Sequence, residues 1–273
     1  MDDEFARFAE IEARGWNDRA IVDAYVDRFA PVTNAVAPLV AELAGGSGKS
    51  VLDLCCGQGD LTRLLCETGA SVSGLDFSRA MLDAAEETAP AASFHEGDAA
   101  DMLFPDGQFD AVVCNFGVMH LPDRQAALDE VCRVLRPGGV FVMSTWIGPE
   151  ASPAFGTVFG AIKSHADFSR APRQPDLFGI AETEIAGEMF ERSGLSLKNH
   201  QVVEPAWFLA DPSDLFRIFL TATVGARMLI TSQPDDVVSA IREDITSAVA
   251  ERFKDGSGYR VPVPVAVMTA GKI

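Results

Sequence analysis

Three acidic residues stand at points along the chain where an apolar run ends, and this pattern could bind a ligand. Asp53 precedes Gly57 and Gly59, glycines that let the backbone bend with positive φ and leave room for a ligand against the main chain. Asp76 ends the next apolar run, and Asp98 follows a third. If these runs are parallel strands, their carboxyl ends meet at the edge where open α/β sheets bind ligands. A carboxylate at the position of Asp76 can accept two hydrogen bonds from ribose hydroxyls, so the pattern predicts a site for an adenosine-containing ligand.

Two such ligands compete for this geometry, a dinucleotide and S-adenosylmethionine (SAM). The dinucleotide motif is G-x-G-x-x-G, and Thr62 occupies its third glycine position here. Asp53 would also serve a pyrophosphate poorly, because both groups are negative. The ammonium and sulfonium groups of SAM are cations, which a carboxylate stabilises. The residues favour SAM, with an NAD(P)-dependent oxidoreductase as the less favoured alternative.

The elements that must position these residues alternate between strand and helix. From the strand that begins at Val51, periodicity and turn residues predict helices over 60–68, 78–88, 123–135 and 181–193 and strands over 70–76, 93–96, 109–115, 139–146 and 195–204. Ser78 is a good N-cap for the second of these helices, because its hydroxyl can accept from free amides of the first turn. The alternation predicts an α/β fold with a parallel, doubly wound sheet.

The flanking segments are expected to cover this sheet. Helical spacing from Phe5 to Leu43 predicts two or three helices before the sheet begins, and residues 211–254 predict two or three more. Prolines alternate with valines over 259–270, which suits an edge-lying or terminal strand. The expected organisation is a helical cover (1–44), a SAM-binding core (45–146), an insertion (147–180), core continued (181–204), a helical lid insertion (205–257) and a terminal core strand (258–273).

Composition narrows the partners and the location. The chain has 22 basic and 40 acidic residues, a net charge of −18 that repels phosphate backbones and anionic membranes, so no nucleic-acid partner is expected. Its five cysteines form no CxxC pair, which suggests a reducing cytoplasm. The N-terminal residues lack a basic region followed by an apolar segment, and no apolar run approaches about 18 residues. We therefore expect a cytoplasmic protein without membrane insertion; a homodimer is an open alternative for which no residue argues.

Several motifs resemble those of the class I SAM-dependent methyltransferases of the ubiquinone/menaquinone-methyltransferase-like group. The order and spacing agree across roughly residues 50–146, and the motifs are residues 51–59, 74–78, 96–99, 104–110 and 134–139. The resemblance implies a Rossmann-like, doubly wound, mostly parallel seven-stranded sheet with a helical N-terminal cover and an inserted helical lid. It also implies SAM as cofactor and S-adenosylhomocysteine as product.

The resemblance also implies roles for residues along the cofactor. Asp76 would bind the ribose, Asp98 the adenine amino group, and the amide of Ala99 the adenine ring. Gly57 and Gly59 would lie against the methionine and ribose parts.

Four further cofactor contacts follow from the same resemblance. Phe77 and Met81 would contact adenine, although core packing explains Met81 equally well. Asn115 and Phe116 would face the transferable methyl group. From the N-terminal helices Tyr25 would reach the methionine moiety, with simple helix packing as the alternative.

Aromatic residues and one histidine are the candidates for acceptor binding. Trp16, Phe29 and Trp146 could form a substrate wall, with simple packing in the core as the alternative for each. His120 is the titratable group in reach, so it is a candidate general base as well as a substrate contact. His120 could instead simply cap or pack the turn before Leu121. With 18 Phe and 3 Trp against 2 Tyr, the pocket suits an apolar or aromatic acceptor.

One departure from the family pattern concerns Cys55 and Cys56. Many members read D-x-G-x-G-x-G, and these cysteines precede Gly57 here. Adjacent side chains on a strand end point to opposite faces, and no further ligands are spaced nearby, so we expect no metal site.

Together these observations predict a SAM-dependent methyltransferase that acts on a small, apolar or aromatic molecule by direct in-line transfer. The alternative is a SAM-binding protein of this fold that catalyses another reaction or acts as a scaffold, because the binding residues would be the same.

Overall fold

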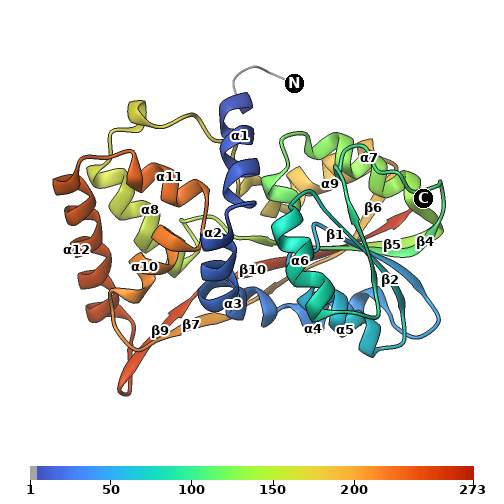
Figure 1. Cartoon of the computed structure of the whole chain (residues 1–273), viewed down its shortest axis with the longest axis horizontal. Coiled ribbons are helices and arrows are strands. Elements are labelled where there is room, and N and C mark those ends of the chain that lie inside the picture. The colour runs from blue at the N-terminus through green and yellow to red at the C-terminus, as the bar shows by residue number, and fades with distance from the viewer. Residues whose placement is uncertain (1–4) are drawn as a thin grey trace.

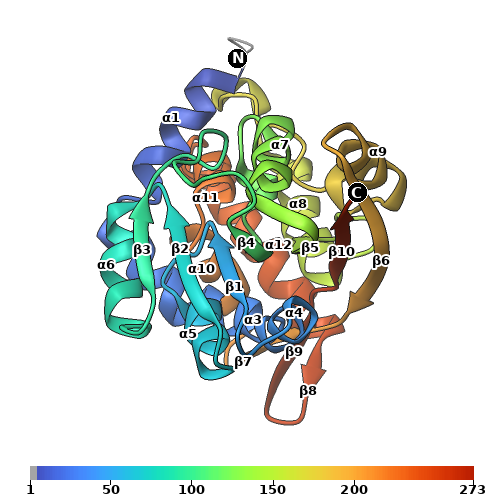
Figure 2. The ribbon, with the colours of Figure 1, turned by 90° about the vertical axis from the view of Figure 1, so that its right-hand side faces the viewer.

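A computed structural model describes residues 5–273, and its centre is a seven-stranded sheet. The strand order is β3-β2-β1-β4-β5-β10-β6, as Figure 2 shows from left to right. The strands are β1 (Ser50–Leu54), β2 (Ser71–Asp76), β3 (Ser93–Glu96), β4 (Phe109–Asn115), β5 (Leu135–Trp146), β6 (Leu195–Val203) and β10 (Val265–Lys272). Strands β1 to β5 pair in parallel, and β10 runs antiparallel to both β5 and β6. The order reverses between β1 and β4, which is where open α/β sheets bind ligands.

Helices cover both faces of this sheet. Their bounds are α4 (Ala37–Ala44), α5 (Asp60–Glu67), α6 (Arg79–Thr88), α7 (Arg124–Val134) and α9 (Thr183–Arg192). Ser78 caps α6 by accepting from the amide of Met81 at 3.1 Å, and Asp123 caps α7 by accepting from Ala126 at 2.9 Å. Strands β1 and β4 are buried on both faces, as expected for parallel strands between helical layers. The α/β fold and the mostly parallel seven-stranded sheet are therefore confirmed.

The N-terminal segment is helical before the sheet begins, and one of its helices contains a π-helical turn. It forms α1 (Ala6–Gly15), α2 (Arg19–Ala24), a π-helical turn η2 (Tyr25–Phe29), α3 (Ala30–Asn34) and then α4. Asp18 separates the first two helices because its side chain accepts from the amide of Ala20. Pro31 and Pro38 occupy first-turn positions, where a missing N–H costs nothing. Residues 19–34 are helical without a break, so the segment makes three helical stretches before the sheet, in agreement with the two or three helices expected.

Two segments far apart in sequence form one helical lobe beside the sheet (Figure 1). The first supplies α8 (Pro153–His165). The second supplies α10 (Asp214–Thr221), α11 (Gly225–Thr231) and α12 (Asp235–Arg252), together with a small sheet of β7 (Ala206–Leu209), β8 (Lys254–Asp255) and β9 (Gly258–Pro262). Helix α12 packs on α8 and α10, so the two segments make one body. The three-stranded sheet was not predicted.

The C-terminal segment supplies a terminal strand of the core, as expected, but it forms two strands and its core strand does not lie at an edge. It divides into β9, in the small sheet, and β10, the last strand of the chain, which lies between β5 and β6 inside the large sheet. Pro262 and Pro264 stand at the division, because proline cannot donate to a ladder. Val265, the first residue of β10, pairs with both Trp146 and Val203, so the points where the lobe joins the sheet lie in one row.

Within residues 5–273, no helix is both long and apolar enough to cross a membrane. No group of three or more His, Cys, Asp or Glu side chains in this described part of the chain is arranged to hold a metal ion.

Candidate active site

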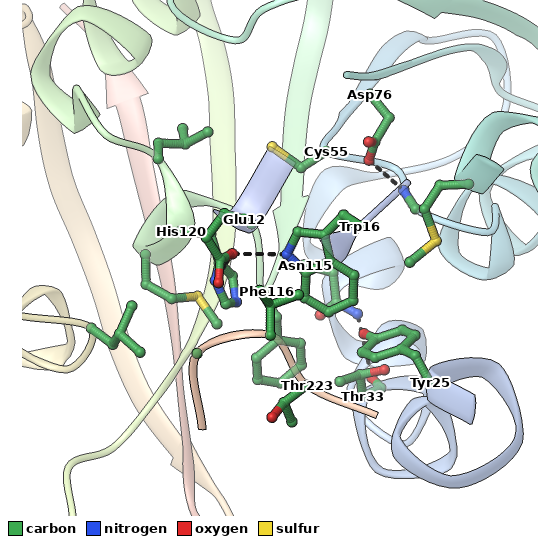
Figure 3. Close-up of a pocket in the computed structure, with 18 of the residues that line it drawn as sticks. Glu12, Trp16, Tyr25, Thr33, Cys55, Asp76, Asn115, Phe116, His120 and Thr223 are labelled. Carbon is green, nitrogen blue, oxygen red and sulfur yellow. Dashed lines mark hydrogen bonds and ion pairs between the residues drawn. The ribbon is translucent and has the colours of Figure 1, made fainter. Parts of the chain in front are cut away.

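A cavity of about 420 Å³ lies at the carboxyl ends of β1, β2 and β4, between the N-terminal helices and the lobe. Figure 3 shows side chains that converge on it. The predicted site residues that line it are Trp16, Tyr25, Phe29, Asp53, Gly57, Asp76, Phe77, Met81, Asp98, Ala99, Asn115, Phe116, His120 and Trp146. Gly59 is the exception among the described residues. The fold thus brings together side chains that are spread widely over the sequence.

The loop between β1 and α5 explains why Gly57 and Gly59 differ. Gly57 has a φ of 54°, and a Cβ placed there would meet no described atom within 4 Å, so its surface is open to a ligand. Gly59 has a φ of 84°, and its Cβ would come within 3.0 Å of Ala85. Gly59 therefore serves the close packing of α5 on α6 and does not line the cavity, contrary to its expected role. Cys55, at the first glycine position of the family pattern, keeps a left-handed φ of 57°.

Asp53 is buried with only 1% of its surface exposed, and Thr62 is its partner. The hydroxyl of Thr62 donates to the Asp53 carboxylate at 2.6 Å. Burial raises the pKa of Asp53 to about 7, although the bond from Thr62 acts in the opposite direction. In the sequence, Thr62 was noted only because it occupies the third glycine position of the dinucleotide motif. In the structure its hydroxyl provides the hydrogen bond to the buried Asp53 carboxylate.

Asp76 fixes the glycine loop to the start of α6. Its two carboxylate oxygens accept from the amides of Gly57 and Ser78, each at 2.9 Å, and Figure 3 shows the first of these bonds. Burial raises the pKa of Asp76, and the amide donors oppose that rise. Each oxygen retains a lone pair, so the carboxylate can hold the loop and accept from a ligand as well.

Four residues form the end of the cavity beyond Asp76. Phe77 is 41% exposed, whereas Met81 and Ala99 are buried. Asp98 lies at the surface, and one of its oxygens accepts from the amide of Ala100 at 2.8 Å. This end offers an apolar slot with a carboxylate at its rim.

Tyr25 enters the cavity from the π-helical turn, a feature that often occurs at functional sites. Its ring lies edge-on to Trp16 at 5.4 Å and stacked on Phe29 at 5.5 Å between centroids. Burial raises the pKa of Tyr25 to about 12, so the phenol stays neutral at physiological pH.

Asn115 and Phe116 follow β4 at the centre of the cavity. Asn115 accepts from the hydroxyl of Ser144 at 2.6 Å and donates to the carbonyl of Thr33 at 3.3 Å. Phe116 has a φ of 61° and stacks on Trp146, with 3.9 Å between ring centroids. The bonds from the neighbouring strand and from α3 fix the Asn115 amide.

An aromatic wall extends from this stack into the lobe. Trp146 contacts Phe29 at 5.7 Å and Phe155 at 5.4 Å between centroids. Phe29 contacts Phe219 at 6.0 Å, and all these rings line the cavity. Trp207 packs on Phe29 from behind at 5.2 Å but does not line the cavity itself.

Glu12 on α1 is a cavity residue that sequence reasoning missed. Its carboxylate accepts from the indole N–H of Trp16 at 2.8 Å and lies 3.2 Å from Nδ1 of His120. A signal for it exists, because Phe8, Glu12 and Trp16 follow one another at four-residue spacing on the apolar face of α1. Other lining residues that were missed are Thr33, Asn34, Cys55, Gln58, Asp60, Leu177 and Thr223.

Comparison with known proteins identifies the family. A family model described as a methyltransferase domain matches residues 51–139. The demethylmenaquinone methyltransferase of Bacillus licheniformis is 35% identical over 170 residues, which cover 54% of this chain and 71% of that protein. The chain belongs to the class I SAM-dependent methyltransferases. Within them it falls in the menaquinone-methyltransferase-like group, and its cofactor is SAM.

Solved structures agree with this methyltransferase fold. A putative methyltransferase from Bacillus halodurans has a TM-score of 0.59 at 20% identity, covering 87% of this chain and 99% of that one. The cyclase SpnF has a TM-score of 0.54 at 20% identity, covering 88% and 81%. Identity at this level shows the fold alone. The family match at 51–139 includes the glycine loop, Asp76 and Asp98 but not the lobe.

The residues of this methyltransferase fit SAM on chemical grounds. Asp53 and Asp76 place buried carboxylates beside the open surface of Gly57, which suits a ligand with a cationic end and ribose hydroxyls. The slot at Phe77 and Met81 suits a flat, apolar ring.

Proposed function

We propose that this methyltransferase methylates a small, apolar aromatic acceptor that carries a hydroxyl, of the quinol or phenol type. The observation that carries the proposal is the continuity of one cavity, which runs from the carboxylates of Asp53 and Asp76 to the aromatic wall around Trp146. The name of the Bacillus licheniformis relative gives demethylmenaquinone as that protein's substrate, and we take the same chemical class for this chain.

The cofactor roles follow the order of residues along the cavity. Asp76 accepts from the ribose hydroxyls while it retains its amide donors. Phe77 and Met81 enclose the adenine ring, with Asp98 at its amino group and the Ala99 amide beside the ring.

The methionine end of SAM would lie at the neck of the loop between β1 and α5. Gly57 leaves room for it, and Asp53 supplies the negative charge that its cationic groups need. Tyr25 closes this end from the N-terminal cover as a neutral phenol.

The acceptor lies beyond Asn115 and Phe116, against the aromatic wall. SAM supplies an electrophilic methyl group, so the protein's task is to hold the acceptor oxygen or ring carbon in line with it and to exclude water. Phe116, Trp146 and Phe29 do this by flat contact with the acceptor ring. His120 lines the same compartment and is the candidate base for the acceptor hydroxyl.

The proposal is tested with methyl-labelled SAM and a panel of substituted phenols and 1,4-naphthohydroquinones. Labelled methyl should appear on the aromatic products. Binding of SAM without transfer to any member of the panel would contradict the proposed acceptor class.

The cofactor site is tested separately by calorimetry with SAM. Asp76→Ala should weaken SAM binding by at least about tenfold, a loss of about 1.4 kcal/mol, because a charged hydrogen bond is lost. Asp83→Ala on the exposed side of α6 is the matched control and should bind as the wild type does. Equal SAM affinities for Asp76→Ala and Asp83→Ala would show that Asp76 does not bind SAM.

A further inference from the structure

We propose that Glu12 is a positioning residue that holds His120 in the tautomer able to accept the acceptor's proton. The inference rests on the proposed function, because it needs an acceptor that carries a hydroxyl. It assigns a role to a side chain on α1, far in sequence from the methyltransferase motifs.

The geometry around His120 is asymmetric. Its Nδ1 lies 3.2 Å from the Glu12 carboxylate, is fully buried, and makes no hydrogen bond to any residue the structure describes. Both side chains line the cavity, but that of Glu12 is 8% exposed and that of His120 is 32% exposed, so the imidazole is the more open of the two. Figure 3 shows the two side chains together above the Phe116 ring. A buried donor at this distance from a buried carboxylate needs only a small rotation to bond to it.

Glu12 is held in place independently of His120. The indole N–H of Trp16 donates to the same Glu12 oxygen at 2.8 Å, one turn further along α1. The backbone carbonyl of Trp16 in turn accepts from the hydroxyl of Ser78 at 2.5 Å. Ser78 follows Asp76 by two residues and donates its amide to it. The carboxylate is therefore anchored to the elements that form the SAM site, and its position does not depend on the histidine.

This arrangement selects one tautomer of the imidazole. A carboxylate accepts hydrogen bonds and donates none, so it favours the form with the proton on Nδ1. Nε2 then carries a lone pair and can accept a proton from the acceptor. The arrangement follows the logic of a base that is oriented by a third group.

Proton transfer to His120 and methyl transfer from SAM together conserve atoms and electrons. The acceptor O–H bond breaks, its proton goes to Nε2 of His120, and the oxygen electron pair becomes available for attack on the methyl carbon. The carbon–sulfur bond then breaks with its electron pair left on sulfur. One proton is released for each methyl group transferred, and no oxidant or metal is required.

The experiment uses Glu12→Met in the full chain, with Glu10→Met as the matched control. Trp16 and Nδ1 of His120 face the same Glu12 oxygen, so a glutamine could still accept from both, whereas methionine is of similar length and removes that acceptor. Glu10 lies exposed on the same helix, outside the cavity, so its substitution removes the same charge without touching the site.

The first readout is methyl transfer to a series of phenols of decreasing pKa. For phenols that are neutral at the assay pH, Glu12→Met should lower kcat by about 10²-fold, within the range of general-base contributions, with SAM affinity unchanged. For a nitrophenol that is already ionised, the loss should fall to less than about threefold. A loss that is equal across the series, or no loss at all, would overturn the proposal.

The second readout needs no acceptor. The ¹⁵N resonances of the imidazoles report the tautomer, and His120 is assigned among the four histidines by its disappearance in His120→Gln. We expect the Nδ1–H form in the wild type and in Glu10→Met, and the Nε2–H form in Glu12→Met. The same tautomer in all three proteins would refute the positioning role, even if none of the phenols proved to be an acceptor. A wild type that shows the expected tautomers but methylates no phenol would refute the acceptor class instead.

Discussion

The buried pair of Asp53 and Thr62 gives a stability prediction that depends on pH. Thr62→Val keeps the shape of the side chain but removes the hydroxyl that donates to Asp53 at 2.6 Å. A hydrogen bond to a charged group contributes about 1.5–3 kcal/mol, against about 0.5–1.5 kcal/mol for a neutral partner. At pH 8.5 the Asp53 carboxyl is ionised, so Thr62→Val should lower the free energy of unfolding by about 1.5–3 kcal/mol. This loss corresponds to about 3–5 °C in Tm for a chain of this length.

At pH 5.5 the same substitution should cost less. The pKa of Asp53 is about 7 in the folded protein and 3.8 in a flexible chain, so the folded state holds the proton more tightly. Asp53 thus favours folding at acid pH, and that contribution is lost as the pH rises from about 4 to about 7. At pH 5.5 the folded carboxyl is mostly neutral, and Thr62→Val therefore removes only a neutral hydrogen bond.

Urea unfolding of both proteins at the two pH values measures these losses. Thr88→Val is the matched control, because the Thr88 hydroxyl donates to the neutral carbonyl of Ala84 at 2.8 Å. Its cost should be below about 1.5 kcal/mol and independent of pH. An equal loss for Thr62→Val at pH 5.5 and 8.5 would show that Asp53 stays in one protonation state, and the reasoning would fail.

Two further predictions concern Asp53 and the contact between Gly117 and Cys55. Binding of SAM at pH 6 should release about one proton, because a cation beside Asp53 favours the ionised form of this carboxyl. Calorimetry in two buffers of different ionisation enthalpy counts the released protons. The same count in Asp53→Asn would exclude Asp53 as their source. Gly117→Ala should destabilise the protein by about 1–3 kcal/mol in thermal unfolding, because its Cβ would come within 2.5 Å of the Cys55 Cβ. Gly160→Ala, with no described atom within 4 Å of the added carbon, is the control for overpacking, and an equal loss there would contradict the packing argument.

The core of the fold could be predicted because its signals are local. Strands β3 and β4 begin and end at the predicted residues, since apolar runs bounded by turn residues report burial directly. The carboxyl ends of parallel strands meet at one edge, so Asp53, Asp76 and Asp98 could be brought to one site without knowledge of any contact.

The parts of the fold and of the site that were not predicted depend on contacts between segments that are distant in sequence. Periodicity shows which face of α1 is buried, but it does not show that Glu12 meets His120, which follows β4 much further along the chain. Nor does it show that α8 packs against α12, or that Pro262 separates two strands belonging to different sheets. These are properties of tertiary packing, which a single sequence does not encode locally.

The alignment of Val265 with Trp146 and Val203 has a consequence for how such proteins diverge. The chain leaves the sheet for the lobe at Trp146 and at Val203 and returns from it at Val265, on three adjacent strands that are about 4.8 Å apart, so these three connections share one seam. The family match at 51–139 ends before that seam begins. A replacement lobe with ends at the same spacing could therefore be exchanged by recombination, leaving the strands that hold SAM unchanged while altering which acceptor the enzyme accepts.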